Sequence, residues 1–422
     1  MHVVSTGANM NSVVPVGYKQ TEVGLIPEDW NYCKLSELIE FPVQNGVFNE
    51  PARKGRGCKL INVSDLYAST PIDISSLELF DASNSEKLRF GIQHGDVFFT
   101  RSSITPDGIA HCNVYDETLK EDIVFDCHLI RVRANKKKIN PFFLFRFCTI
   151  AQTRKYLVAN AKTTTMTTIG QGVIAGLPVL LPPLPEQEAI AEALSDTDAL
   201  IESLEQLITK KLHLKQGAMQ ELLTGKKRLP GFSGEWEVKR FDEIVRLRKE
   251  RIDPRRSGIQ EFCIELEHIE QGTGCLAGYT ETGENSSLKS VFHKDDVLFG
   301  KLRAYLRKYW LANSTGVCST EIWVLMAIRS LLIPRFLFQL VKVDSFVEVA
   351  STAYGTHMPR SDWNVVKNYE VPLPPIAEQE IIATILSDMD AEITSLETKL
   401  AKTRQLKQGM MRELLTGRIR LR

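Results

Sequence analysis

Two segments of the chain, within residues 181–229 and 373–421, have apolar side chains at the alternating three- and four-residue spacing typical of a helix that packs against another helix. Prolines stand just before each segment, carboxylates fill its first turn, and Gly225 and Gly417 follow its last apolar turn. At 1.5 Å per residue, about 38 residues make a helix of roughly 55 Å, which is too long for an ordinary globular helix. The pattern therefore predicts two long helices with a coiled-coil seam, formed by Ile190, Leu194, Ile201, Leu204 and Ile208 in one and by Ile382, Leu386, Met389, Ile393, Leu396 and Leu400 in the other.

The two helical segments are copies of each other. Residues 181–229 align without a gap on residues 373–421, and 30 of the 49 positions are identical. Weaker likenesses join residues 95–101 to 295–301 and residues 141–145 to 334–338. The chain thus consists of a variable unit, a helix, a second variable unit and a second helix, and two similar halves imply two similar tasks.

The order of charges predicts how the helices pair. Residues 186–209 carry seven carboxylates and no Lys or Arg, whereas residues 210–228 carry six bases and one carboxylate. The second helix repeats this order, with six carboxylates over 378–397 and eight bases against one carboxylate over 399–422. Parallel pairing would place acid against acid, so we expect an antiparallel pair with pseudo-twofold symmetry that acts as a ruler between the variable units. The alternative is a rod that only joins two domains.

The variable units, each roughly 140 to 160 residues long, have the size of a domain with its own core. β-branched and aromatic runs predict strands at 96–99, 123–125, 128–132, 296–299 and 322–326. One helical pattern follows in each unit, at about 141–160 and 334–350. The units are therefore expected to be α+β domains.

Basic side chains gather at three places in these units, and each group is either a phosphate-binding patch or a solvated face. The groups are Arg131, Arg133, Lys136, Lys137 and Lys138; Arg246, Arg248, Lys249, Arg251, Arg255 and Arg256; and Lys301, Arg303, Arg307 and Lys308, the last interleaved with Tyr305, Tyr309 and Trp310. A polar loop also precedes each long helix, at 162–166 and at 354–360. Small hydroxyls, Lys, His and Arg suit contacts to phosphates and base edges, although a loop that only ends a strand is the alternative.

Composition excludes several classes of protein. The 422 residues include 52 basic and 52 acidic side chains and are 43% hydrophobic, which fits a globular chain of two or three domains. No apolar run approaches the roughly 18 residues needed to cross a bilayer, and the start of the chain lacks the features of a secretory signal. We therefore expect a cytoplasmic protein with no membrane partner. The eight cysteines are scattered without a CxxC pair, so no metal site is predicted.

The sequence lacks the common motifs of catalysis. It has no GxxxxGK[ST] phosphate loop, no HExxH pair, no GxSxG nucleophile turn and no glycine-rich cofactor loop of an amino-methyltransferase. The sequence therefore favours binding over chemistry, with no catalytic or cofactor-binding residue in this chain.

The order of these parts along the chain resembles that in the specificity subunit of type I restriction-modification enzymes. The resemblance covers nearly the whole chain from Gly17 onward, and its most specific parts are LPPLPEQEAIA, LSDTDALI and KQGAMQELLTGKKRL with their copies in the second helix. It implies an α+β fold with two globular target recognition domains separated by two long antiparallel coiled-coil helices in a pseudo-twofold internal repeat. The corresponding division is a tail at 1–17, recognition domains at 18–180 and 229–372, and helical spacers at 181–228 and 373–422.

The resemblance also implies a non-catalytic reader of double-stranded DNA. Each recognition domain would read one half of an asymmetric bipartite site, while the helices set the spacing and dock two modification subunits that carry S-adenosylmethionine. Restriction subunits, with ATP and Mg, would complete the nuclease, and this chain would hold no cofactor. The residues expected in the spacer and in docking are Glu186, Gln187, Leu194, Asp196, Glu378, Gln379, Leu386 and Asp388. Those expected to contact DNA are Arg101, Lys162, Thr163, Thr164, Lys301, Arg303, Tyr354, Gly355, Thr356, His357 and Arg360.

Two functions of other classes stay open. A self-sufficient methyltransferase or nuclease would need a cofactor motif that the sequence lacks. A coiled-coil scaffold for protein partners alone would show no preference among DNA sequences.

Overall fold

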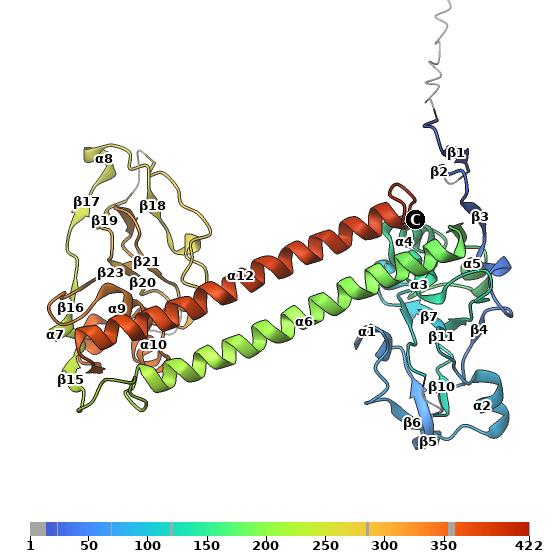
Figure 1. Ribbon diagram of the computed structural model, residues 1–422, viewed down its shortest axis with the longest axis horizontal. Coiled ribbons are helices and arrows are strands. Elements are labelled where there is room, and N and C mark those ends of the chain that lie inside the picture. Colours follow the sequence, from blue (N-terminus) through green and yellow to red (C-terminus); the bar gives the residue numbers. More distant parts are fainter. Residues whose placement is uncertain are drawn as a thin grey trace, which may run out of the picture. The chain divides into compact units, whose positions relative to one another are not determined.

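The computed structural model describes residues 14–22, 24–68, 70–118, 121–283, 287–352 and 359–421. The chain divides into a first unit, Met1–Ser203 with Leu400–Arg422, and a second unit, Leu204–Lys399 (Figure 1). Two long helices, α6 (Leu184–Leu222) and α12 (Ile376–Leu414), each contain 39 residues, and each contributes to both units. None of the helices in the described ranges is long and apolar enough to cross a membrane.

Shortly after each long helix ends, the chain contains a glycine that no other residue could replace without strain. Gly225 and Gly417, three residues beyond the last helical residues, have φ values of 71° and 74°, in the left-handed region that favours glycine. A Cβ at Gly225 would lie 3.1 Å from the ring of Trp236, and one at Gly417 would lie 2.7 Å from Pro27. The turn after each long helix thus needs both the backbone freedom and the small size of glycine.

Ion pairs give the direction of the helices within each unit. In the first unit Asp198 of α6 pairs with Lys407 of α12, and Glu186, earlier in α6, pairs with Arg420, later in the chain. In the second unit Lys211 pairs with Glu392, and Lys215, later in α6, pairs with Asp390, which is earlier in α12. Because the partner's number falls as the number in α6 rises, the two helix segments run antiparallel in each unit.

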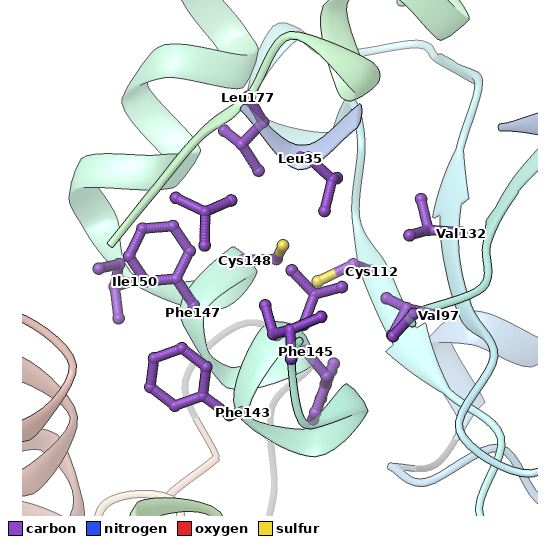
Figure 2. Close-up of a cluster of buried hydrophobic side chains, with 14 of the residues drawn as sticks. Leu35, Val97, Cys112, Val132, Phe143, Phe145, Phe147, Cys148, Ile150 and Leu177 are labelled. Carbon is purple, nitrogen blue, oxygen red and sulfur yellow. The ribbon is translucent and has the colours of Figure 1, made fainter. Parts of the chain in front are cut away.

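A four-stranded antiparallel sheet in the order β4-β11-β7-β9 forms the centre of the first unit. All side chains of β7 and β11 are buried, and the core extends from them to α3, to Ile190 and Leu194 of α6 and to Leu414 of α12. Figure 2 shows part of this core, with Phe145 and Cys148 of α3 beside Cys112 of β9. The strands are β1 (Tyr18–Thr21), β2 (Gly24–Pro27), β3 (Asn31–Lys34), β4 (Gln44–Asn45), β5 (Lys54–Ile61), β6 (Glu78–Phe80), β7 (Val97–Thr100), β8 (Ser102–Ser103), β9 (Cys112–Val114), β10 (Ile123–Phe125), β11 (Leu129–Val132), β12 (Lys162–Thr163), β13 (Thr167–Thr168) and β14 (Pro178–Leu181). The helices are α1 (Asp65–Ala68), α2 (Asn84–Phe90), α3 (Pro141–Thr149), α4 (Ala151–Ala159) and α5 (Gln171–Ala175).

The second unit repeats this arrangement with different residues. Its central sheet has the order β16-β23-β20-β21, and its core takes in Leu222 of α6 with Ile382 and Leu386 of α12. In both units the strand that leads into the long helix pairs antiparallel with the strand that follows a tryptophan, β14 with β3 and β24 with β15. The strands are β15 (Glu237–Arg240), β16 (Val245–Leu247), β17 (Arg251–Ile252), β18 (Cys263–Ile264), β19 (Lys289–Phe292), β20 (Val297–Gly300), β21 (Tyr309–Leu311), β22 (Gly316–Ser319), β23 (Ile322–Ala327) and β24 (Glu370–Leu373). The helices are α7 (Phe241–Ile244), α8 (Pro254–Ser257), α9 (Pro334–Leu340), α10 (Asp344–Ser351) and α11 (Trp363–Val366).

The strands predicted from the sequence lie within one residue of β7, β10, β11, β20 and β23. The helical patterns predicted at about 141–160 and 334–350 are confirmed, but each is divided into two helices. Ile150, between α3 and α4, is extended with φ −68° and ψ 150°, and its side chain is buried in the core. In the second unit the break falls between Leu340 and Asp344 and contains a buried lysine, Lys342.

Candidate nucleic-acid interface

In the first unit, a small antiparallel sheet, β12-β13-β8, brings predicted contact residues together. Lys162 and Thr163 form β12, and β13 joins β12 to β8, which directly follows Arg101. The Arg101 N–H donates to the carbonyl of His128 at 2.8 Å, and the Ile169 N–H donates to the carbonyl of Arg101 at 3.0 Å. We call Arg101, Lys162, Thr163 and Thr164, all of them exposed, the first contact edge.

The second unit has the same backbone connections at its second contact edge, which consists of Lys301, Arg303 and Arg360. The Lys301 N–H donates to the carbonyl of Glu321 at 3.0 Å, and the Ser361 N–H donates to the carbonyl of Lys301 at 2.8 Å. Leu302 pairs with Arg360 in a β-bridge, and the Arg303 N–H donates to the carbonyl of Pro359. Tyr354, Gly355, Thr356 and His357 lie outside the described residues.

Most cations of the contact edges are available for an outside ligand. Among the described residues, none forms an ion pair with the side chain of Arg101, Lys162, Lys301 or Arg303. Arg360 is different, because its guanidinium forms a two-point pair with the carboxylate of Glu321 at 3.0 and 3.1 Å. Sequence reasoning missed Glu321, since nothing in its neighbours along the chain connects it to Arg360.

In the first two basic groups, three arginines form neither a phosphate patch nor a solvated face. Arg131 is 2% exposed and donates to the carbonyl of Gly91, and burial lowers its pKa to about 10. Arg133 pairs with the buried Asp96 at 2.6 Å, and Arg248 pairs with Asp296 at 2.8 Å. These side chains neutralise buried carboxylates rather than meet solvent.

The third group loses two cations to partners within the protein and two aromatic residues to burial. Arg307 pairs with Asp344, and the Lys308 ammonium donates to the carbonyl of Leu266 at 2.6 Å. Tyr309 and Trp310 are buried. The exposed remainder of this group is Arg303 and Tyr305, with Lys301 half-buried beside them.

The repeated glutamates at the start of the long helices hold each helix to its unit. Glu186 accepts hydrogen bonds from Trp30 at 3.1 Å and from Arg420 at 2.6 Å, and we call these three residues the first Trp–Glu–Arg cluster. The second cluster consists of Glu378, Trp236 and Arg228, with bonds of 3.1 Å from the indole and 2.8 and 3.0 Å from the guanidinium. Burial alone would raise the pKa of Glu378, but the bonds from Arg228 and Trp236 lower it below its ordinary value.

The remaining predicted spacer residues divide into buried and exposed ones. Gln187 accepts from the N–H of Asn140 and donates to the carbonyl of Pro182, and Gln379 makes the equivalent bonds with Ile333 and Pro374. Leu194 and Leu386 lie in the cores of their units. Asp196 and Asp388 are exposed, so they alone among these eight residues are free to meet another subunit.

Two other repeated aspartates, which the prediction did not include, join the sheet domains to the helices. Asp390 pairs with Lys215 of α6 and, at 2.8 Å, with Lys342, whose side chain is 3% exposed. Burial lowers the pKa of Lys342, and Asp390 opposes this shift. Asp198 pairs in the same way with Arg146 of α3 and Lys407 of α12. Each aspartate thus connects one domain cation to one cation of the other long helix.

One group of three neighbouring side chains in the described ranges could hold a metal ion. The ligand atoms of Asp126, Cys127 and His128 lie within 4.8 Å of one another. Asp126 already accepts from both the backbone N–H and the Nδ1 of His128, at 2.6 and 2.7 Å. Burial raises the pKa of the Cys127 thiol, which opposes formation of the thiolate, the form that binds metals. The geometry therefore favours an aspartate that orients a histidine.

The two units share the order of the central sheet and carry exposed cations at the same edge, an arrangement that suits a protein that binds a polyanion at two places. The family described as the type I restriction modification DNA specificity domain matches residues 27–212 and again residues 233–406. The type I restriction enzyme EcoDI specificity subunit of Escherichia coli is 25% identical, over 63% of this chain and 67% of its own length. The MjaVIII specificity subunit of Methanocaldococcus jannaschii is 22% identical, over 94% of each chain. The crystal structure of the S subunit of the type I restriction-modification system from M. genitalium has a similar fold, with a TM-score of 0.57 at 14% identity over 91% of this chain and 96% of that one.

The chain therefore belongs to the type I restriction modification DNA specificity family. This membership confirms the prediction of a specificity subunit, which recognises DNA while catalysis lies in partner subunits. The two matched segments fit the recognition of a bipartite DNA sequence. Neither the family match nor the relatives assign the contact residues, which stay a prediction.

Proposed function

We propose that each unit reads one half of an asymmetric bipartite DNA sequence through its contact edge, and that α6 and α12 set the distance between the half-sites. The observation that carries this proposal is the repetition of one backbone frame with different exposed side chains. Arg101 and Lys301 occupy the same place in their units, each between a donated and an accepted backbone bond. Two equal frames with unequal side chains suit two unequal half-sites.

The proposed contacts in the first unit are Arg101, Lys162, Thr163 and Thr164, and those in the second are Lys301, Arg303 and Arg360 with the segment at 354–357. The unpaired cations supply contacts to phosphates, while hydroxyls and the guanidinium can also reach base edges. The proposed division keeps recognition domains at 18–180 and 229–372, helical spacers at 181–228 and 373–422, and a tail at 1–17. In this arrangement the helices form an antiparallel coiled coil that relates the two domains by a pseudo-twofold axis.

The catalytic partners complete the proposed assembly. Two modification subunits would dock on the helices and methylate adenine with S-adenosylmethionine, and restriction subunits would use ATP and Mg in the same cytoplasmic complex. Asp196 and Asp388 support this docking role, because they are exposed on helices whose apolar seam is largely buried. This chain would hold no cofactor.

The first experiment measures adenine methylation of a random-sequence DNA pool by the modification subunits, with and without this chain. We expect a gapped, asymmetric motif that appears only when the chain is present. Methylation that ignores the chain, or modified sites that share no motif, would support a protein scaffold instead. Methylation by the chain alone would point to an enzyme.

A second experiment tests the ruler. One heptad is removed from α6 together with the facing heptad of α12, so that the apolar seam keeps its register. Seven residues at 1.5 Å shorten the pair by about 10 Å, or roughly three base pairs of DNA. An unchanged gap in the methylated motif would contradict the role of the helices as a spacer.

A further inference from the structure

The pair formed by Arg360 and Glu321 in the second contact edge has a geometry that fits one particular base. The Nε of Arg360 donates to one carboxylate oxygen of Glu321 at 3.0 Å, and its Nη2 donates to the other at 3.1 Å. These two donors form the side edge of the guanidinium. A guanidinium has five N–H groups, so the end edge, made of Nη1 and the second N–H of Nη2, keeps two parallel donors.

The backbone around this pair places Arg360 and Glu321 on opposite sides of one segment of the contact edge. Lys301–Arg303 lies between the two partners, because the Lys301 N–H donates to the Glu321 carbonyl and Leu302 bridges Arg360. The next residue, Ser361, is buried and bonds to the carbonyls of Lys301 and Ala350. The side chain of Arg360 is 55% exposed and that of Glu321 is 26% exposed, so solvent reaches the guanidinium while the carboxylate supports it.

The net charge of the pair distinguishes between the two ligands that an arginine commonly binds on DNA, a phosphate and a base edge. A phosphate is attracted by net positive charge, and the carboxylate of Glu321 cancels the charge of Arg360. Lys301 and Arg303, which have no acidic partner in the described ranges, are better placed for phosphates. A neutral base edge with two acceptors needs two fixed parallel donors instead, and guanine presents that pattern as O6 and N7 in the major groove.

We propose that Arg360 reads a guanine in the half-site of the second unit, and that Glu321 is a positioning residue that holds the guanidinium in its reading orientation. This inference rests on the proposed function. The first unit lacks the device, because Thr168 and His128 occupy the positions of Arg360 and Glu321 in its frame. A guanine contact made by this pair is therefore expected in the second half-site only.

The test maps the methylated motif of the full complex for Arg360→Ala, Arg360→Lys and Glu321→Gln. Arg360→Ala should relax the motif at one G·C pair of the second half-site by about tenfold to a hundredfold and leave the first half-site unchanged. Arg360→Lys keeps the charge but not the fork, so it should relax the same pair. Glu321→Gln should relax that pair by a smaller factor. Arg240→Ala is the matched control, because Arg240 also forms an exposed two-point pair, with Asp242 of the same unit, and it should leave the motif unchanged.

A modified base separates reading from structural damage. Replacing the guanine by 7-deazaguanine removes the N7 acceptor, so it should weaken the wild-type complex severalfold and leave Arg360→Ala unaffected. The inference would be overturned if Arg360→Ala weakened binding equally on all sequences and lowered the salt slope by about one, as for a lost phosphate contact. It would also be overturned if every position of a clear wild-type motif survived Arg360→Ala. A wild-type complex without any gapped motif would instead contradict the proposed function itself.

Discussion

The two contact edges place different side chains on one backbone frame, whereas the two Trp–Glu–Arg clusters keep the same side chains. The guanidinium and carboxylate of Arg360 and Glu321 are replaced in the first unit by the hydroxyl of Thr168 and the imidazole of His128. The clusters have matching indole bonds of 3.1 Å to a glutamate that is 5% exposed in one unit and 0% exposed in the other.

This difference separates the residues that build a unit from those that give it a preference. A buried carboxylate must keep its partners, because an unpaired charge in the interior is costly, so the clusters tolerate little change. An exposed side chain on a fixed backbone frame can change at little cost to folding. Variation between the units is therefore expected at the contact edges, and repetition at the clusters.

The largest effects are expected where a cluster is broken. Arg228→Ala and Arg420→Ala each leave a buried glutamate without its cation, which should lower the free energy of unfolding of the affected unit by about 3 to 5 kcal/mol. Hydrogen exchange with mass spectrometry, read separately for the peptides of each unit, measures the two effects in the full chain. The exposed Arg255→Ala should cost far less than either cluster variant. A large loss in one unit and none in the other would break the equivalence of the clusters.

A smaller and unequal effect is expected at the aspartates that join domain and helix. Asp390→Ala leaves the buried Lys342 without an acid and should cost the second unit about 3 kcal/mol. Asp198→Ala should cost the first unit less, because Arg146 is 12% exposed, against 3% for Lys342, and so has better access to water.

The same hydrogen-exchange measurement, combined with a rescue, checks this explanation. Adding Lys342→Met to Asp390→Ala removes the stranded charge and should recover most of the lost stability of the second unit. If the double variant is as unstable as Asp390→Ala, the loss does not come from burying an unpaired ammonium.

The sequence predicted what depends on neighbours along the chain. The long helices follow from a periodic seam, and β7 and β23 follow from short runs of β-branched and aromatic residues. The break at Ile150 could not be predicted, because a buried side chain in the core, rather than a helix-breaking residue, holds the backbone extended there.

The candidate site was predictable only in part, because the fate of a charge depends on distant residues. Arg101 and Lys301 were found from the strand runs that precede them, and the structure leaves both without an acidic partner among the described residues. Arg248 looked equally available, but it neutralises Asp296, 48 residues away. Glu321 carried no signal, since its importance comes from a partner 39 residues later.

The contact edges should respond separately to matched substitutions. His128→Ala removes an imidazole that Asp126 holds at 2.7 Å, so it should alter base preference severalfold in the first half-site and leave the second unchanged. Glu321→Ala should alter base preference in the second half-site and leave the first unchanged. The methylated motifs of both variants check this, and a change in both half-sites from one substitution would contradict independent reading by the two units.

The smallest expected effect is the acid response of the second cluster. The pKa of Glu378 in the folded chain lies below its ordinary value of 4.5, so its stabilising contribution is present above that value and is lost as the pH falls toward the folded pKa. Glu378→Gln does not titrate at this position, so the free energy of unfolding of the second unit should fall less steeply with acid than in the wild type. Glu281→Gln, at an exposed carboxylate, should leave the slope unchanged. If the free energy of unfolding changes equally with pH in the wild type and Glu378→Gln, Arg228 and Trp236 do not stabilise the charge of Glu378. They would then contribute to stability through packing alone.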